Sequence, residues 1–419
     1  MYNILDYGAI ADGKTLNSAA IQKAIDTCHA NGGGTVVIPA GQFVSGTIWL
    51  RSNVELHLAH GANLIASRDL DDYNDNDAYE QNFFSINEQW NGKHLIIALE
   101  CENVAITGHG VIDGSGDEFY GEIEPHRDFV WDKGIALAKD KEKLRLGQLV
   151  VFVECQHIKV TDVTIKNCSS WTMLFHGCDY VQVRGYKSFN LPYAANTDGI
   201  DIDSCSFVTM SDCIIEAGDD AIAVRCNPRK LKNNTKVCEN VTITNCALSS
   251  YSSGIRIGVG NGYLRHLCVS NLSYKHASNL ITFSVSYLGK SISHIEDVML
   301  SNITCERTNR IVEINGEYGY VKNVVIDNIR ANATATMNLT AIGDCEVENF
   351  RVSNVVAHYK NKYDPMTSEQ RKKRGDYLVY AKNVKGLELS NLKLTIEPGE
   401  EDTWKDNICV EDCPDAIVK

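Results

Sequence analysis

The sequence predicts a right-handed parallel β-helix, a solenoid in which every turn of the chain adds short parallel strands to its neighbours. Three observations lead to this prediction. The chain has 419 residues without a Pro/Ser-rich linker or a change in composition, whereas most compact cores stop growing at roughly 250–300 residues. A six-residue pattern with a polar turn residue recurs along the chain. The spacing of these polar residues matches the period of solenoids.

The repeated pattern reads apolar, any, apolar, any, Asn/Asp/Gly, usually followed by an apolar residue or Cys. Its polar residues Asn245, Asn271, Asn302, Asn328 and Asn354 lie 26, 31, 26 and 26 residues apart. Apolar residues at every second position are typical of a strand. Asn tolerates a left-handed backbone, so we expect these residues to stack in a ladder. A β-sandwich is the alternative fold, but it would not repeat the same polar residue so regularly.

A helix is predicted over residues 17–29, with Asn17 or Ser18 as its N-cap. Its apolar face comprises Ala20, Ile21, Ala24, Ile25 and Cys28. A β-helix exposes unpaired strands at its end, so we expect this helix to cap the solenoid. Residues 1–419 are expected to form a single domain. The segments Gly121–Leu146 and Tyr363–Asp376 lack the strand pattern and are interpreted as surface excursions.

The charge of the chain limits its partners. A formal net charge of −14 and a pI of about 5.3 argue against nucleic acid or an anionic membrane. The same charge disfavours a long polyanionic substrate unless local Arg and Lys offset it. No run of apolar residues is long enough to span a membrane. The start of the sequence shows no secretory signal, so we expect a cytoplasmic protein, or a secreted one if a leader had been removed.

The chain has 15 cysteines, an odd number that suits a reducing compartment. Cys168, Cys213 and Cys246 follow the polar residue of the repeat and are interpreted as a column of small buried side chains. A metal site is the alternative, but the sequence has no CxxC pair.

Two acidic motifs carry the predicted chemistry: Asn196-Thr-Asp198-Gly-Ile-Asp201 and Gly218-Asp219-Asp220-Ala-Ile222. Asp198 and Asp219 are 21 residues apart, close to one turn, and neighbouring turns are about 4.8 Å apart. Clustered carboxylates raise one another's pKa, so that one can donate a proton while another activates water. Asp219 and Asp220 cannot face the same way on a regular strand, so a bulge or turn is expected there. Structural turn residues and a calcium site are the alternatives.

These motifs resemble those of glycoside hydrolase family 28, the polygalacturonase-like enzymes. The likeness begins at Asp6-Tyr-Gly-Ala9 and Asp12-Gly13, includes Gly108–Gly114, and is sharpest at the two acidic motifs. It implies an inverting hydrolase without metal or cofactor. It also implies that Asp219 is the general acid, and that Asp198 and Asp220 hold and deprotonate the attacking water. The carboxyls would then be roughly 6.5–9.5 Å apart.

Two further family motifs are altered. The Gly-His-Gly motif corresponds to Ser252–Gly258, where Ser253 replaces the His and Arg256 is additional. The Arg-Ile-Lys motif, expected near Asn279–Tyr287, is missing. The usual arginine contact with a uronate carboxylate is therefore in doubt. Either Arg225 or Arg256 replaces it, or the substrate is not a galacturonan.

Asn196, His176 and Tyr287 complete the predicted substrate-binding residues, with Arg225, Ser253 and Arg256. His176 is equally consistent with a buried structural role, Arg225 with pairing to the acidic cluster, and Tyr287 with a surface position.

The sequence therefore predicts an inverting, exo-acting glycoside hydrolase of pectin-related or other plant-derived oligosaccharides. The excursion Gly121–Leu146 would block one end of the cleft. A β-helical polysaccharide lyase or epimerase and a non-catalytic carbohydrate-binding solenoid are the alternatives. The oligomeric state, the sugar and the linkage are left open.

Overall fold

The computed structural model describes residues 1–124, 135–140, 142–287, 291–361 and 367–419. The residues group into two compact units, which are described separately. Unit 1 comprises residues 1–221 and 228–236, and unit 2 comprises residues 222–227 and 237–419. The single domain over residues 1–419 therefore stays a prediction.

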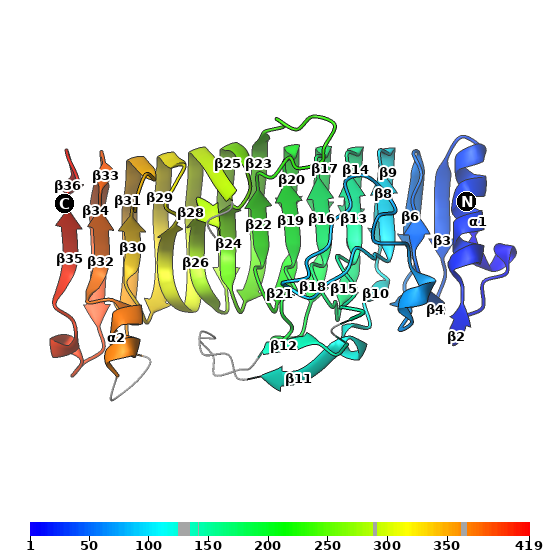
Figure 1. The fold of residues 1–419 in the computed structure, drawn as a ribbon, viewed down its shortest axis with the longest axis horizontal. Helices are drawn as coiled ribbons and strands as arrows, with labels where there is room; N and C mark the ends of the chain where they lie inside the picture. The colour runs from blue at the N-terminus through cyan, green and yellow to red at the C-terminus, as the bar shows by residue number, and fades with distance from the viewer. Residues whose placement is uncertain (125–134, 141, 288–290, 362–366) are drawn as a thin grey trace. The chain divides into compact units, whose positions relative to one another are not determined.

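Unit 1 is built from three parallel sheets whose strands stack one turn on the next (Figure 1). The first sheet contains β1 (Tyr2–Asn3), β3 (Gly34–Ile38), β6 (Val54–Leu58), β9 (Glu102–Gly108), β14 (Gln156–Thr161), β17 (Asp179–Arg184) and β20 (Ser206–Ser211). The second contains β2 (Asp12–Leu16), β4 (Gly41–Ser45), β7 (Ala62–Ala66), β10 (Val111–Asp113), β15 (Thr164–Lys166), β18 (Lys187–Phe189) and β21 (Ile214–Ala217). The third contains β5 (Ile48–Trp49), β8 (Ile96–Leu99), β13 (Val150–Val153), β16 (Met173–His176) and β19 (Ile200–Asp203).

Unit 2 has the same parallel arrangement, with longer strands. One row contains β23 (Cys238–Ser250), β25 (Gly262–Tyr274), β28 (Ser291–Asn315), β29 (Tyr320–Ala333), β31 (Glu346–Tyr359), β33 (Val384–Lys385), β34 (Glu388–Ile396) and β36 (Ile417–Val418). The other contains β22 (Ile222–Arg225), β24 (Ser253–Gly258), β26 (Ala277–Ser284), the end of β28, β30 (Met337–Thr340), β32 (Tyr377–Lys382) and β35 (Asp406–Glu411). Parallel strands connected in this way are right-handed, so the predicted right-handed parallel β-helix is confirmed.

The predicted Asn ladder is present in unit 2. The backbone φ of Asn271, Asn302 and Asn328 is 56°, 56° and 53°, in the left-handed region that Asn tolerates. The side-chain amide of Asn302 donates to Asn271 Oδ1 over 3.1 Å, and that of Asn328 donates to Asn302 Oδ1 over 2.8 Å. Each amide thus satisfies the one on the next turn, which explains why the same residue recurs.

The repeat position predicted for Cys168 is wrong. The strands β14, β17 and β20 are paired in register, and each is followed by a residue with a left-handed backbone: Asp162, Gly185 and Asp212. Cys213 follows Asp212. Val163, not Cys168, occupies the equivalent place, because Asn167 ends β15 on the next face of the solenoid. Cys168 is nevertheless buried and has a free thiol.

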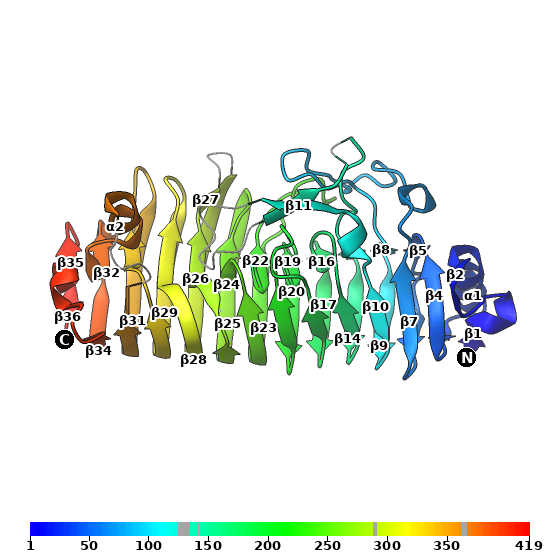
Figure 2. The same cartoon turned by 90° about the horizontal axis from the view of Figure 1, so that it is seen from below.

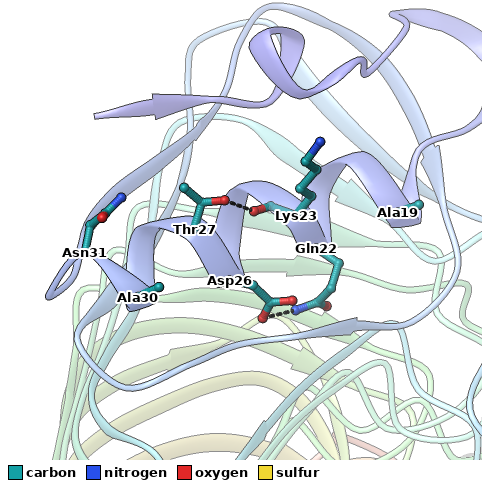
Figure 3. Close-up of a pocket in the computed structure, with 7 residues that line it drawn as sticks. All are labelled: Ala19, Gln22, Lys23, Asp26, Thr27, Ala30 and Asn31. Carbon is teal, nitrogen blue, oxygen red and sulfur yellow. Dashed lines mark hydrogen bonds between the residues drawn. The ribbon is translucent and has the colours of Figure 1, made fainter.

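The predicted cap helix is α1, Ser18–Ala30. It buries Ile21, Ala24, Ile25 and Cys28 against the first turn. Its Gln22 side chain completes the edge of β5, because the amide accepts from Trp49 N over 2.8 Å and donates to Trp49 O over 3.0 Å. Figure 3 shows the outer face of the helix, a shallow depression lined by polar and small residues.

The remaining short elements lie in turns. They are the helix α2 (Ser368–Arg374) and the 3-10 helices Ile4–Tyr7, Leu70–Asp72, Gly116–Glu118 and Glu401–Thr403. The helix α2 falls in the predicted excursion Tyr363–Asp376, of which residues 363–366 lie outside the described part. No helix in the described ranges is long and apolar enough to cross a membrane.

Candidate active site

The two acidic motifs of unit 1 lie side by side. Asp198 precedes β19, and Asp219 and Asp220 follow the end of β21 at Ala217. The backbone N–H of Asn196 donates to Oδ2 of Asp219 over 3.2 Å, and that of Gly199 donates to the carbonyl of Asp220 over 2.9 Å. The expected turn is present, because residues 218–221 lie outside any strand. The one-turn spacing thus brings Asn196, Asp198, Asp219 and Asp220 together.

Two glycines allow this close approach. A Cβ atom on Gly218 would lie 2.4 Å from Thr197 Oγ1 and 2.6 Å from the carbonyl oxygen of Ala194. A Cβ atom on Gly199 would lie 2.6 Å from the carbonyl oxygen of Ala221. Such distances are shorter than van der Waals contact, so only glycine fits at either position. The motifs carry these glycines because their backbones touch.

The three candidate catalytic carboxyls differ in burial. Asp198 and Asp220 are 4% and 3% exposed, whereas Asp219 is only half-buried. Two further carboxyls, Asp201 and Asp203, point outward from β19 and are also buried. The sequence motifs predicted no role for these two, although the alternation Ile-Asp-Ile-Asp places both on the outer face of a strand.

The outer face of the third sheet changes from apolar to acidic at β19. Leu174 of β16 is in register with Asp201 of β19. On the preceding turns, Val151 and Ile97 occupy the same column. These apolar side chains are fully buried although they point away from the solenoid interior. Something outside the sheet therefore covers the face on the N-terminal side of the acidic cluster.

Residues 73–95, between β7 and β8, supply that cover with an aromatic cluster. The Phe83 ring lies 5.3 Å from Trp90 and 6.0 Å from Trp171, between ring centroids. Residues 228–236 hold this segment from the other side, because the Arg229 guanidinium lies 4.6 Å from the centre of the Phe83 ring. Lys230 Nζ also donates to the carbonyl of Asn82 over 2.7 Å. The covered part of the outer face therefore ends at β16, and the acidic side chains of β19 follow on the next turn.

His176 lies at this boundary. It is the last residue of β16, is in register with Asp203, and is buried beside the Phe83 ring at 6.4 Å. The structure therefore places it under the covering segment and adjacent to the acidic face.

In the described part of the excursion Gly121–Leu146, β11 (Tyr120–Glu124) and β12 (Ile135–Ala138) pair as an antiparallel ribbon. Figure 2 shows β11 on the same side of unit 1 as the covering segment. Residues 125–134 and 141 of the excursion lie outside the described part. The backbone N–H of Ala136 donates to the carbonyl of Tyr193 over 2.8 Å, so the ribbon is attached to the loop that leads into Asn196. Its role in blocking the cleft stays a prediction.

Four of the predicted substrate-binding residues belong to unit 2. Arg225 ends β22, and Ser253 and Arg256 lie on β24, where Arg256 is in register with Ala223 and Thr282. The Arg256 guanidinium donates to Ser252 Oγ over 3.3 Å and to Ser284 Oγ over 3.4 Å. It also lies 5.8 Å from the centre of the Tyr287 ring, which belongs to β27 (Ser286–Tyr287). Unit 2 thus gathers Ser253, Arg256 and Tyr287, and Ser253 is buried.

Metal binding gains no support from side-chain geometry. Within the described ranges, no group of three or more His, Cys, Asp or Glu side chains could hold a metal ion.

The chain matches known proteins over most of its length. The family model described as glycosyl hydrolases family 28 matches residues 28–342. The exo-poly-alpha-D-galacturonosidase of Dickeya chrysanthemi is 30% identical over 255 residues, 52% of this chain and 41% of that protein. A probable polygalacturonase of Vitis vinifera is 25% identical over 384 residues, 87% of this chain and 65% of that protein. This chain therefore spans less than two thirds of the length of either relative.

A solved structure shows the same fold. The hyperthermoactive exopolygalacturonase from Thermotoga maritima superposes with a TM-score of 0.69 at 23% identity, covering 85% of this chain and 86% of that one.

The predicted cytoplasmic location is wrong. The relatives are polygalacturonases, which act on pectin outside the cell. The prediction depended on the composition of the first residues of the given sequence and on the number of cysteines. A buried thiol, such as that of Cys168, is inert and does not report its compartment.

The family match confirms the resemblance, and the chain belongs to glycosyl hydrolases family 28.

Proposed function

We propose that this chain is an exo-acting galacturonan hydrolase that inverts the configuration of the sugar it releases. The observation that carries the proposal is the junction of the half-buried Asp219 with the buried Asp198 and Asp220 in unit 1. Family membership supports hydrolysis as the reaction. The names of the relatives support galacturonan as the substrate.

Each carboxyl has a role that its surroundings favour. Asp219, the most exposed of the three, donates a proton to the glycosidic oxygen as the bond breaks. The Asn196 N–H donates a hydrogen bond to its Oδ2 and so helps to orient the carboxyl. Asp198 and Asp220 hold a water molecule and remove its proton as it attacks the anomeric carbon from the opposite face. Water adds to one sugar, and the leaving sugar takes the proton from Asp219.

Arg256 is the proposed contact for a galacturonate carboxylate. It stands in the altered Gly-His-Gly motif, and its guanidinium is oriented by Ser252, Ser284 and the Tyr287 ring. An oriented guanidinium binds a carboxylate through two parallel hydrogen bonds. Arg225, on the preceding strand, is the second candidate. This assignment would explain how the chain manages without the Arg-Ile-Lys motif.

Exo-action is supported by the covered face beside the acidic cluster. Phe83 and Trp90 occupy the outer face of the turns before β19, where a longer saccharide would otherwise extend. A chain end that stops at this cover places its terminal sugar at the carboxyls. The enzyme would therefore remove one short piece at a time.

The test is mass spectrometry of the products from defined oligogalacturonates in water enriched in heavy oxygen. The proposal predicts one product length from the first minutes onward, with one heavy oxygen at the new reducing end. Unsaturated products without the label would identify a lyase instead. Random product lengths would refute exo-action alone. The absence of any product, with binding retained in the Asp198→Asn, Asp219→Asn and Asp220→Asn variants, would identify a carbohydrate-binding solenoid.

A further inference from the structure

Arg145 is a buried cation behind the acidic motifs, and neither the repeat nor the family motifs assign it a role. It ends the excursion and is 0% exposed. Six oxygens, all neutral, lie within hydrogen-bond distance of its five guanidinium N–H groups, so one N–H of Nη1 is shared between two acceptors. The acceptors are Gln89 O at 3.3 Å, Tyr120 Oη at 3.3 Å, Ser169 O at 2.8 Å, Ala195 O at 2.6 Å, Glu88 O at 2.5 Å and Asn196 Oδ1 at 2.9 Å.

A buried guanidinium is costly, and these neutral oxygens do not cancel its charge. An uncharged side chain would be the simpler way to fill this space. The acceptors belong to four separate segments: the covering segment, β11, the turn before β16 and the loop before Asp198. Arg145 therefore fixes the position of the acidic motif relative to three other parts of unit 1.

The connection from Arg145 to the proposed general acid has two steps. Arg145 Nη2 holds the Asn196 side chain, and the Asn196 backbone N–H donates to Asp219 Oδ2 over 3.2 Å. Asn196 has a φ of 55°, a conformation that costs energy unless it is supported locally. The same guanidinium holds the carbonyl of Ala195, so both ends of that peptide unit are anchored.

Tyr120 provides a second link between Arg145 and Asp219. Burial raises the pKa of Tyr120, and the negative charge of Asp219 raises it further, so the phenol is within electrostatic reach of that carboxyl. The Tyr120 hydroxyl in turn accepts a hydrogen bond from Arg145. The ionisable groups that these contacts place near Asp219 in unit 1 include Asp198, Asp220, Tyr120 and Arg145.

We propose that Arg145 is a positioning residue that holds Asn196, and through it sets the orientation of the Asp219 carboxyl for proton donation. The excursion would then serve the chemistry by bringing this arginine under the acidic motif. The inference rests on the proposed function, in which Asp219 is the general acid.

Two substitutions separate the geometry of Arg145 from its charge. Arg145→Lys keeps the charge and loses the fork of donors, so kcat should fall about 10- to 100-fold. Its KM should change little, and the basic limb of its pH profile should stay in place. Arg145→Met loses both, so kcat should fall at least as far. The basic limb of its profile should move to higher pH, because removing a positive charge raises the pKa of the acid.

The control is Lys139→Gln, which removes an exposed cation of the same excursion paired with Glu118 at 3.2 Å. It should leave kcat and the pH profile unchanged. If Arg145→Met does not fold, Asn196→Gly replaces it. Glycine keeps the left-handed backbone and the N–H to Asp219 but removes the Arg145 acceptor. Its kcat should fall as in Arg145→Lys.

Folded Arg145 variants with a kcat within threefold of the wild type would overturn the inference, and so would a lower kcat in Arg145→Met with an unmoved basic limb. In either case the wild-type chain still cleaves, and the proposed function stands. A wild-type chain that cleaves no galacturonate would overturn the proposed function and this inference with it.

Discussion

The backbone N–H of Asn196 donates a hydrogen bond to Oδ2 of Asp219 over 3.2 Å, and this bond joins the two acidic motifs of the chain. Asp198 follows Asn196 by two residues, so the proposed acid and one of the proposed bases depend on the same turn of backbone. A displacement of that turn would affect both halves of the reaction. Catalysis should therefore be more sensitive to the backbone at residues 194–199 than to the surface around it.

Gly218→Ala tests this sensitivity. The new Cβ would lie 2.4 Å from Thr197 Oγ1 and 2.5 Å from the carbonyl of Leu191, so the loop must move away. We expect kcat to fall by about 10²-fold or more, since a displacement of about 1 Å is enough for such a loss. The control is Gly121→Ala, where the nearest atom would be 3.5 Å away. Equal activity in the two variants would show that the close approach is unimportant.

Phe83→Ala tests the cover over the third sheet. The variant removes the ring that packs on Trp90 and Trp171 and under Arg229. We expect longer products, such as dimers and trimers, to appear early in the digestion of galacturonan, as resolved by anion-exchange chromatography. The neighbouring Phe84 is 48% exposed, so Phe84→Ala should keep the wild-type product. An unchanged product length in Phe83→Ala would remove the structural support for exo-action.

His94 makes the covering segment sensitive to pH. Burial lowers the pKa of His94 from 6.5 to about 4, and its ring contacts Tyr79 Oη, Asn82 Oδ1 and the carbonyl of Gln148. The folded chain thus keeps His94 neutral where the unfolded chain protonates it. The stabilisation is complete above pH 6.5 and is lost as the pH falls toward 4, by on the order of 3 kcal/mol.

We therefore expect amide hydrogen exchange in residues 73–95 to speed up between pH 7 and pH 5, after correction for the intrinsic rate. His94→Gln should flatten this dependence, whereas substitution of the exposed His60 by Gln should not. A pH dependence that survives in His94→Gln would assign it to another group.

The Asn ladder predicts a difference between two substitutions at one position. Asn302 has a φ of 56° and bonds to Asn271 and Asn328. Asn302→Gly keeps the backbone conformation and loses the hydrogen bonds, at about 0.5–1.5 kcal/mol each. Asn302→Ala should lower the free energy of unfolding by a further 1–2 kcal/mol or so, because alanine is strained in the left-handed region. Equal losses in urea denaturation would show that the backbone conformation contributes nothing.

The fold could be predicted because its rules are local. Each turn of the solenoid repeats the strand alternation and an Asn in the left-handed conformation. The regular spacing of residues such as Asn302 and Asn328 therefore predicts the Asn ladder from the sequence. The cap helix was equally readable from its apolar face. Cys168 was misplaced because two successive strands of one turn, β14 and β15, both end with a polar residue, and the pattern does not say on which face each lies.

The candidate site was predictable only in part. Asp198, Asp219 and Asp220 belong to compact motifs at one-turn spacing, and the stacking of parallel turns brings them together. Phe83 and Arg145 reach the site from long irregular segments, through contacts that no period encodes. In the sequence, a buried Arg in a charged segment, such as Arg145, cannot be told from a surface Arg. Only its contacts in the folded chain show that it is buried.

The most direct test of the central claim is the kcat of Asp219→Asn on a defined oligogalacturonate, measured beside Asp212→Asn. Asp212 is an exposed turn residue paired with Arg184 at 3.4 Å, and Asn suits its φ of 59°. The proposed role of Asp219 predicts a fall in kcat of about 10²–10⁴-fold with substrate binding retained, and no change for Asp212→Asn. Activity in Asp219→Asn within a few-fold of the wild type would contradict the assignment of the general acid and the mechanism built on it.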